Sequence, residues 1–464
     1  MKLLFVTLLL VTLLAPGASA SVYTVYADGS GSYPTIQAAV NASVEGDTIR
    51  LGDGTFSGTG NRDLQVDRPR VFLSASGDRL ECILDAGGLP FGDLGVDPDE
   101  SETFRFENIT FRAGSAFDVR YNKVVELTGC RFENCTGLVT IWPYVIPSGR
   151  IIATGCSFHG GGGSLSAHVI TLTNCDVIAR QGGIADASYL TANDCRFMGN
   201  NNSDGGGSLF RLQRVELYDC VYELVDCWFF DNAANALIRN LDGQLTLTGC
   251  SFVYGNGPGG VDLAVEWPEA STLIERCIFA HRSEGGVFAI EAGASIPQLT
   301  NCDIYANIGG NWVGPIADQY GVGCNMSADP QFCDWPSGNL TLFNTSPCLP
   351  ANNSCGVLIG AEGQGCTDPT AVEAAPGGGL RLSAAPNPFN PKTRLSFSLP
   401  EAARVSLAVF DASGRRVATL LDGAPRPAGE QAVDWDARGL ASGVYLARLG
   451  AGSLRQETKL TLLR

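Results

Sequence analysis

The chain has 464 residues, of which 57 are glycine, 16 are cysteine and only 17% are charged, and its net charge is −17 at pH 7. Few charges and many glycines argue against a helical or a disordered protein and favour a β protein with many tight corners. The negative charge argues against nucleic acid or an anionic membrane as a partner bound by charge.

The first twenty residues have the features of a secretory signal peptide. Met1-Lys2 precedes an apolar run from Leu3 to Leu14, and Ala18-Ser-Ala20 offers a small-residue cleavage site. The apolar run is too short to span a bilayer. We therefore predict an exported chain that begins at Ser21 and has no membrane-spanning segment.

Residues 22–56 predict a strand, a loop, a short helix and a second strand. Ile36, Ala39 and Val40 form one apolar face of the helix. Repeat proteins need atypical ends that cover their first repeat, so we expect this helix to be an N-terminal cap.

One short phrase recurs eight times between residues 127 and 304, at intervals of 19 to 32 residues. Each copy ends an alternating apolar and polar run, has Gly, Asn, Asp or Arg at a corner, and continues with Cys-x-Phe or a similar pair. This spacing is typical of a stacked solenoid, and the two-residue alternation predicts strands. The cysteines of the copies are Cys130, Cys156, Cys175, Cys195, Cys227, Cys250, Cys277 and Cys302.

These features predict a parallel β-helix of roughly ten coils in which Cys and Phe point inward. Residues stacked on adjacent parallel strands have Cβ atoms about 4.8 Å apart, too far for a disulfide, so we expect the repeated cysteines to be buried thiols. The later cysteines lie in an irregular Pro/Asn/Gly-rich stretch. There we predict disulfides from Cys324 to Cys333 and from Cys348 to Cys355, because these pairs are close in sequence.

Residues 22–366 resemble the pectin-lyase-like right-handed β-helix proteins, pectin methylesterases included. The resemblance lies in the opening Tyr23-Thr-Val-Tyr26-Ala-Asp28-Gly and in the Cys-x-Phe coils. It implies a right-handed helix with a substrate groove along one parallel sheet. The catalytic phrases of methylesterases and polygalacturonases are absent, so the resemblance specifies a fold and leaves the activity open.

The chain changes character after Cys366. Residues 367–379 form a Pro/Gly/Ala linker, and residues 380–464 contain short alternating strands that predict a small β-sandwich. Residues 21–375 have 18 Lys and Arg against 41 Asp and Glu, whereas residues 376–464 have 12 against 7.

Three phrases in the last segment carry a second resemblance: Pro386-Asn-Pro-Phe-Asn-Pro391, Val409-Phe-Asp-Ala-Ser-Gly-Arg415 and Gly443-Val-Tyr445. They resemble the C-terminal sorting domains of the type IX secretion pathway and the related flagellar-hook-cap immunoglobulin-like modules. The resemblance implies export to the bacterial cell surface or beyond, with the outer-membrane secretion machinery as partner of residues 380–464.

The predicted domains are therefore a signal peptide (1–20), a right-handed parallel β-helix with an N-terminal helical cap and a Cys-rich end (21–366), a linker (367–379) and a β-sandwich sorting domain (380–464). The fold class is all-β.

Strand alternation predicts which side chains face a ligand on one sheet. In Phe117-Asp-Val-Arg-Tyr121 the aromatic residues point inward, which leaves Asp118 and Arg120 outside. Extended to other coils, the rule gives catalytic candidates Asp118, Asp186, Arg211, Arg239 and His168, and ligand-binding candidates Arg120, Trp142, Arg211, Arg239 and Asp262. Arginines suit uronate carboxylates, the two aspartates suit Ca²⁺ or acid–base chemistry, and Trp142 suits a sugar ring. A charged outward face is also what any soluble sheet requires.

A calcium ion is the one cofactor that the sequence suggests, at Asp97, Asp99 and Glu102 in an acidic loop. The spacing does not match an EF-hand, and acidic loops are commonly only solvated.

We interpret the chain as a surface-delivered β-helix that binds polysaccharide or another extracellular ligand. One alternative is a polysaccharide lyase or glycoside hydrolase for uronate-containing glycans. A second alternative is a structural or adhesion protein of the cell surface.

Overall fold

The computed structural model describes residues 20–95, 102–120, 123–142, 149–202, 208–212, 220–256, 260–367, 381–387, 389–399, 403–411, 415–426, 429–451 and 454–462. The chain divides into two compact units, Met1–Thr367 and Asp368–Arg464. Within the described ranges, no helix has the length and hydropathy needed to cross a membrane.

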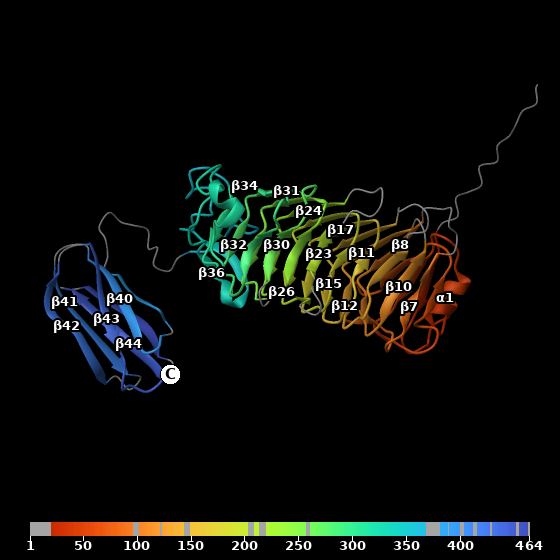
Figure 1. The fold of residues 1–464 in the computed structure, drawn as a ribbon. Helices are drawn as coiled ribbons and strands as arrows, with labels where there is room; N and C mark the ends of the chain where they lie inside the picture. Colours follow the sequence, from red (N-terminus) through yellow and green to blue (C-terminus); the bar gives the residue numbers. More distant parts are fainter. Residues whose placement is uncertain are drawn as a thin grey trace, which may run out of the picture. The chain divides into compact units, whose positions relative to one another are not determined.

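The first unit is a parallel β-helix built from three long sheets, in which strands of consecutive coils lie side by side (Figure 1). The 12-stranded sheet contains, in order, β1 (Val22–Val25), β2 (Thr48–Leu51), β5 (Val71–Ser74), β8 (Thr103–Glu107), β11 (Val124–Thr128), β14 (Arg150–Thr154), β17 (Val169–Thr173), β20 (Tyr189–Asn193), β24 (Val221–Val225), β28 (Gln244–Thr248), β31 (Ser271–Glu275) and β34 (Gln298–Thr300). The 11-stranded sheet contains β3 (Gly54–Phe56), β6 (Cys82–Asp85), β9 (Thr110–Arg112), β12 (Arg131–Glu133), β15 (Ser157–His159), β18 (Asp176–Ile178), β21 (Arg196–Met198), β25 (Trp228–Phe230), β29 (Ser251–Val253), β32 (Ile278–Ala280) and β35 (Asp303–Tyr305). The 10-stranded sheet contains β4 (Leu64–Val66), β7 (Pro90–Leu94), β10 (Ser115–Arg120), β13 (Val139–Trp142), β16 (Leu165–Ser166), β19 (Ala185–Asp186), β23 (Ser208–Leu212), β27 (Ala236–Asn240), β30 (Val261–Val265) and β33 (Gly286–Ile290).

The repeated phrase marks the corner between the 12-stranded and the 11-stranded sheet. The residue before each repeated cysteine has a left-handed backbone, with φ between 51° and 65°. Gly, Asn and Asp tolerate this conformation best, which explains their recurrence there. Arg276 is the exception, and it binds a later segment of the chain through its carbonyl and its guanidinium.

The interior consists of stacked columns, as the sequence predicts. All eight repeated cysteines are buried thiols, and Cys130 Sγ donates to the carbonyl of Phe106 one coil earlier (3.3 Å). Phenyl rings stack in the same way, with ring centroids of Phe229 and Phe252 4.4 Å apart and those of Phe252 and Phe279 4.7 Å apart. The columns join every coil into one continuous core.

The N-terminal end of the β-helix is covered by α1 (Ile36–Ala42). Thr35 caps this helix by accepting the backbone N–H of Ala38 (3.2 Å), and Ile36, Ala39 and Val40 are buried against the first coil.

The C-terminal end carries a small module, residues 324–366, with β36 (Phe332–Asp334), η2 (Trp335–Ser337), β37 (Asn339–Phe343) and β38 (Gln364–Cys366). Its predicted disulfides are wrong: Cys324 pairs with Cys355 and Cys333 with Cys366, while Cys348 is a buried thiol. Closeness in sequence misleads here because β37 pairs with both β36 and β38, which brings the two ends of the module together. Between the module and the last coil lies η1 (Gly314–Gln319).

The second unit consists of two antiparallel sheets around one apolar core. The first has β39 (Arg381–Ala385), β40 (Lys392–Leu399) and β43 (Gly429–Asp436), and the second has β42 (Arg416–Arg426), β41 (Ala403–Asp411), β44 (Gly443–Ala451) and β45 (Leu454–Leu462).

The phrase from Pro386 to Pro391 closes the free edge of β45. Asn387 donates to the carbonyl of Lys459 (2.7 Å) and accepts the N–H of Thr461 (2.8 Å), and Phe389 N–H donates to the Thr461 carbonyl. An edge covered in this way is protected from pairing with other chains.

A carboxyl group lies buried between the last coil and the module. Asp303 is fully buried, accepts the N–H of Ala328 (2.9 Å) and faces the thiol of Cys348 (3.5 Å). Burial raises the pKa of Asp303 from 3.8 to about 7.

The raised pKa predicts a pH-dependent stability that Asp303→Asn removes. Below pH 3.8 the group is protonated in both states and costs nothing. Between pH 3.8 and about 7 the carboxyl group ionises in the unfolded state but stays protonated in the folded state. The free energy of unfolding of the wild type therefore falls by on the order of 4 kcal/mol, and the fall is complete above pH 7. Thermal unfolding should therefore show the variant more stable than the wild type at pH 8 and similar at pH 4. Parallel pH profiles of the two proteins would contradict this assignment.

Candidate functional site

An outward row of polar side chains runs across the 10-stranded sheet. Register pairs Gln65 with Asp93, Asp93 with Asp118, and Asp118 with Thr140. The row continues through Ser166 to Asp186, and the pairing of Ala185 with Phe210 places Arg211 next, followed by Arg239.

Four of the predicted residues therefore share one row: Asp118, Asp186, Arg211 and Arg239. Asp186 and Arg211 are exposed, whereas Asp118 and Arg239 are half-buried. Adjacent strands are about 4.8 Å apart, so Asp186 neighbours Arg211, while Asp118 lies three strands away, about 14 Å, from Asp186. The two predicted catalytic aspartates are too far apart to act across one bond.

A carboxylate that the sequence prediction assigned to a loop stands beside Asp118. Asp93 lies in β7, in register with Asp118 and about 4.8 Å from it. Apolar Phe91 and Leu94 on either side of it, both buried, were the available signal, but the acidic run that follows hid it.

The two arginines of the row differ in their surroundings. Arg239 Nε lies 3.0 Å from Glu266 Oε1, so a neighbouring carboxylate fixes its guanidinium. Arg211 is paired in register with Arg239 and projects into solvent. Like charges on adjacent strands are unfavourable unless an anion lies between them.

A second outward row lies on the same sheet, two residues further along each strand. Arg120, which is exposed, is in register with Trp142; the orientation of the Trp142 side chain lies outside the described residues. His168 follows β16 at the corresponding position and contacts the edge of the Tyr189 ring (5.1 Å). Burial lowers the pKa of His168, so the imidazole is neutral at pH 7.

Asp262, a predicted ligand-binding residue, is not on the surface. Its exposed fraction is 2%, and in the adjacent coils Leu237 and Val287 are buried in the same way. The parity rule fails because β30 is buried at every residue from Asp262 to Val265, so its burial does not alternate.

Inside the coil, Asp262 Oδ1 accepts a hydrogen bond from Arg282 Nη1 (2.5 Å). Arg282 is itself 1% exposed. Burial raises the pKa of Asp262 to about 6, and the guanidinium opposes that shift. The pair is an internal ion pair and contributes nothing to a ligand surface.

Two of the three predicted calcium ligands, Asp97 and Asp99, lie outside the described residues. The third, Glu102, is 5% exposed, and its carboxylate meets Lys123 Nζ (2.8 Å) and Arg68 Nη1 (3.2 Å). The Glu102 carboxylate is therefore already paired with two cationic side chains. Among the residues that the structure describes, no three His, Cys, Asp or Glu side chains are arranged to hold a metal ion.

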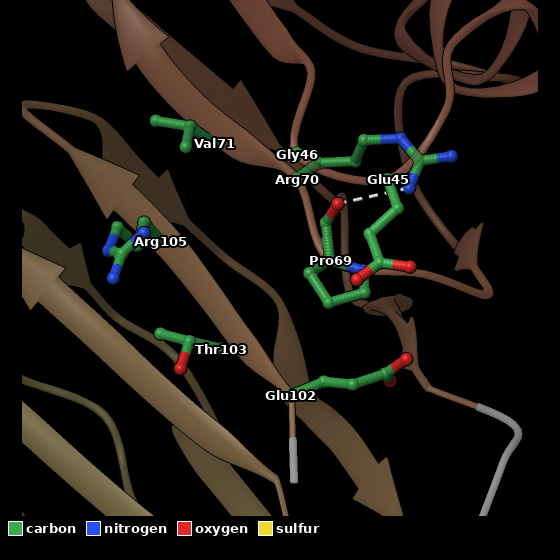
Figure 2. A pocket seen from close by; sticks show the side chains of 8 residues that line it. All are labelled: Glu45, Gly46, Pro69, Arg70, Val71, Glu102, Thr103 and Arg105. Carbon is green, nitrogen blue, oxygen red and sulfur yellow. Dashed lines mark hydrogen bonds between the residues drawn. The ribbon is translucent and has the colours of Figure 1, made fainter. Parts of the chain in front are cut away.

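A pocket of about 550 Å³ lies beside Glu102 on the 12-stranded sheet (Figure 2). The Arg70 guanidinium at its edge donates to the Pro69 carbonyl (3.0 Å), the hydrogen bond drawn in Figure 2, and to Ser43 Oγ (2.7 Å). Arg105, on its other side, pairs with Glu126 (2.5 Å). Glu102 and Arg105 beside this pocket are ion-paired within the protein, whereas the row on the 10-stranded sheet includes the exposed Arg211. We therefore take the row as the better candidate.

Comparison with known families agrees with this architecture. The model of the right handed beta helix region matches residues 93–252, and that of the secretion system C-terminal sorting domain matches residues 383–462. The chain joins a right-handed β-helix to a sorting domain. The sorting domain marks the protein for type IX secretion to the cell surface or the extracellular space.

Solved structures with a similar fold have low sequence identity to the chain. Pectate lyase Pel9A is 14% identical (TM-score 0.33; 75% of this chain and 98% of that chain covered). A pectin methylesterase from Aspergillus niger is 12% identical (TM-score 0.24; 68% and 91% covered). A tailspike protein mutant of E. coli bacteriophage HK620, in complex with a hexasaccharide, is 11% identical (TM-score 0.22; 92% and 88% covered). No curated protein matches the sequence.

The buried ion pair yields a test of the interior columns. Asp262→Leu alone leaves the Arg282 guanidinium buried without its anion and should destabilise the β-helix by about 3–5 kcal/mol. Asp262→Leu combined with Arg282→Asn copies the neighbouring coil, which has Leu237 and Asn232 at these positions, and should recover most of that stability. Denaturant unfolding measures both. If the double variant is no more stable than the single one, Asp262 does not share a column with Leu237, or Arg282 does not share one with Asn232.

Proposed function

We propose that the β-helix binds an acidic extracellular polysaccharide along the outward row of its 10-stranded sheet. Support comes from Arg211 and Arg239, which stand on adjacent strands in register. Glu266 holds the Arg239 guanidinium, so a ligand carboxylate would bind chiefly at the exposed Arg211 beside it, through charge-assisted, bidentate hydrogen bonds.

The rest of the row fits a linear polymer. It repeats once per strand, about every 4.8 Å, so successive coils present polar groups to successive parts of an extended chain. Thr140 and Ser166 offer hydroxyl groups between the acidic and the basic end of the row. Uronate-containing glycans carry both the carboxylates and the hydroxyl groups that such a row would bind.

Secretion brings the protein to where such polymers occur. The sorting domain marks the chain for the cell surface or the extracellular space, and the solenoid is strongly acidic, with the arginine pair at one end of the row. Nonspecific attraction of a polyanion is therefore disfavoured, and binding depends on the local arginine pair.

Arg211→Gln should weaken binding of oligogalacturonate by about tenfold to a hundredfold, because one charged hydrogen-bonding group contributes about 1.5–3 kcal/mol. Arg239→Gln should have a similar effect. Arg150→Gln is the matched control: it removes the same charge from an exposed residue on the 12-stranded sheet. Titration calorimetry at low salt measures the three affinities. Equal affinities of Arg211→Gln and the wild type would refute the site.

Cleavage of the polysaccharide is the second candidate function, and one observation favours it. Asp93 and Asp118 stand in register on adjacent strands, whose backbones are about 4.8 Å apart. Side chains on such neighbours can bring two carboxyl groups to the separation of about 5–5.5 Å that retaining glycosidases use. An enzyme of this kind releases reducing ends, and a lyase produces unsaturated uronates that absorb in the ultraviolet.

Assays of both products over a panel of polysaccharides, with Ca²⁺ and with a chelator, separate binding from cleavage. If the chain cleaves, Asp118→Asn should lower the rate at least a hundredfold, the scale of general acid–base catalysis. Binding without either product supports the first proposal. A blank glycan array with an inactive protein would favour a structural or adhesion role instead.

Deletion of residues 380–464 should leave the β-helix folded and held inside the cell envelope, because the sorting domain has its own core. Cell fractionation and surface proteolysis of bacteria that express the truncated chain measure this. Arrival of the truncated protein at the cell surface would contradict the assigned role of the segment.

A further inference from the structure

The module of residues 324–366 covers an apolar strip on the outside of the β-helix. Outward residues of β25, β29 and β32 that would face water in other coils are apolar here: Trp228, Phe230, Val253, Ile278 and Ala280. At the same positions, β12 and β21 carry Arg131 and Arg196.

The contact is mainly hydrophobic. Phe332, Leu340, Leu342, Leu349 and Ile359 of the module form one cluster with this strip. Without the module, the strip would be a contiguous exposed apolar surface, which soluble proteins normally avoid.

Hydrogen bonds tie both ends of the module to the β-helix. At its start the N–H of Met326 donates to the Cys302 carbonyl (2.8 Å) and the N–H of Ala328 donates to Asp303 (2.9 Å). The N–H of Gly360 donates to the Arg276 carbonyl (2.7 Å), and the N–H of Ala361 donates to Ser251 Oγ (3.0 Å). Arg276 keeps the left-handed conformation that other coils give to Gly, Asn or Asp, and its guanidinium reaches the Leu358 carbonyl (3.4 Å).

The module is too small to hold itself together by packing alone. Its three strands have three, five and three residues. Structures of this size normally need cross-links. The disulfides Cys324–Cys355 and Cys333–Cys366 interleave along the chain, so each closes a loop that contains one end of the other.

The remaining cysteines are chemically separate from these four. All twelve are buried thiols, and burial raises the pKa of Cys82 and of Cys302 to about 12. Thiols that are buried in this way are inaccessible to a partner disulfide, hence inert to disulfide exchange. The four bridged cysteines are at least partly exposed.

We propose that the module is an oxidation-dependent lock: it closes over the apolar strip of β25, β29 and β32 only after its four cysteines are oxidised, and reduction reopens it while the β-helix stays folded. In each closing step two cysteine thiols lose two electrons and two protons. These reduce the disulfide of an exchange partner of the thiol–disulfide oxidoreductase class to a dithiol. The chain thus carries the strip uncovered in a reducing compartment and covered after export.

The test uses the oxidised mature chain, treated with increasing dithiothreitol under native conditions, then alkylated and mapped by mass spectrometry. We expect alkylation at Cys324, Cys333, Cys355 and Cys366 and none at the other twelve. Together with it, protease cleavage within 324–366 should become about tenfold faster or more, binding of a hydrophobic dye should rise, and the far-ultraviolet spectrum of the β-helix should persist.

Two variants serve as matched comparisons. Cys333→Ser with Cys366→Ser should behave like the reduced chain without reductant, whereas Cys135→Ala, which removes a buried thiol, should behave like the wild type. An unchanged protease pattern and dye signal after complete reduction of the four cysteines would overturn the proposal. Alkylation of the buried ladder thiols at the same reductant concentration would overturn it as well, since the β-helix would then open together with the module.

Discussion

The structure depends on one constraint: each coil must place its residues in register with those of the coil before it. In-register stacking puts every side chain against its counterpart one strand away, so a column tolerates only residues that fit one another. It also requires the chain to turn at the same place in every coil. The left-handed residues from Gly129 to Asn301 and the buried cysteines that follow them meet both requirements.

The columns also show how a change of residue is accommodated. Five residues after the repeated cysteine, the coils carry Gly161, Arg180, Gly255 and Arg282. Each buried arginine lies beside the glycine of the preceding coil: Arg180 donates to the carbonyls of Gly160 (2.8 Å) and Gly163 (2.9 Å), and a side chain on Gly255 would overlap the Arg282 guanidinium. Burial lowers the pKa of Arg180 to about 10, which leaves it charged at neutral pH. A large residue in one coil thus requires a small one in the coil before it.

The same constraint determines what the sequence could predict. The Cys-x-Phe phrase repeats because the columns repeat, so the fold follows from local patterns. Alternation within strands likewise brings Asp118, Asp186, Arg211 and Arg239 into one row. The prediction failed at Asp262, because β30 is buried on consecutive residues and does not alternate. It missed Asp93, because a neighbouring acidic run masked its strand. The disulfides could not be deduced, since they depend on how β36, β37 and β38 pair, and no repeat describes that end of the chain.

Stacking positions the outward row, the row supports binding of an acidic glycan, and the sorting domain delivers the solenoid to the cell surface. All of this depends on the register of the coils, which a short thiol-reactive cross-linker measures most directly. Thr171 pairs with Thr191 on the next strand, whereas Thr246 lies three strands away, about 14 Å. A cross-linker that spans one strand spacing should join cysteines in Thr171→Cys/Thr191→Cys and leave Thr171→Cys/Thr246→Cys unlinked. Linkage of the second pair without the first would contradict the account.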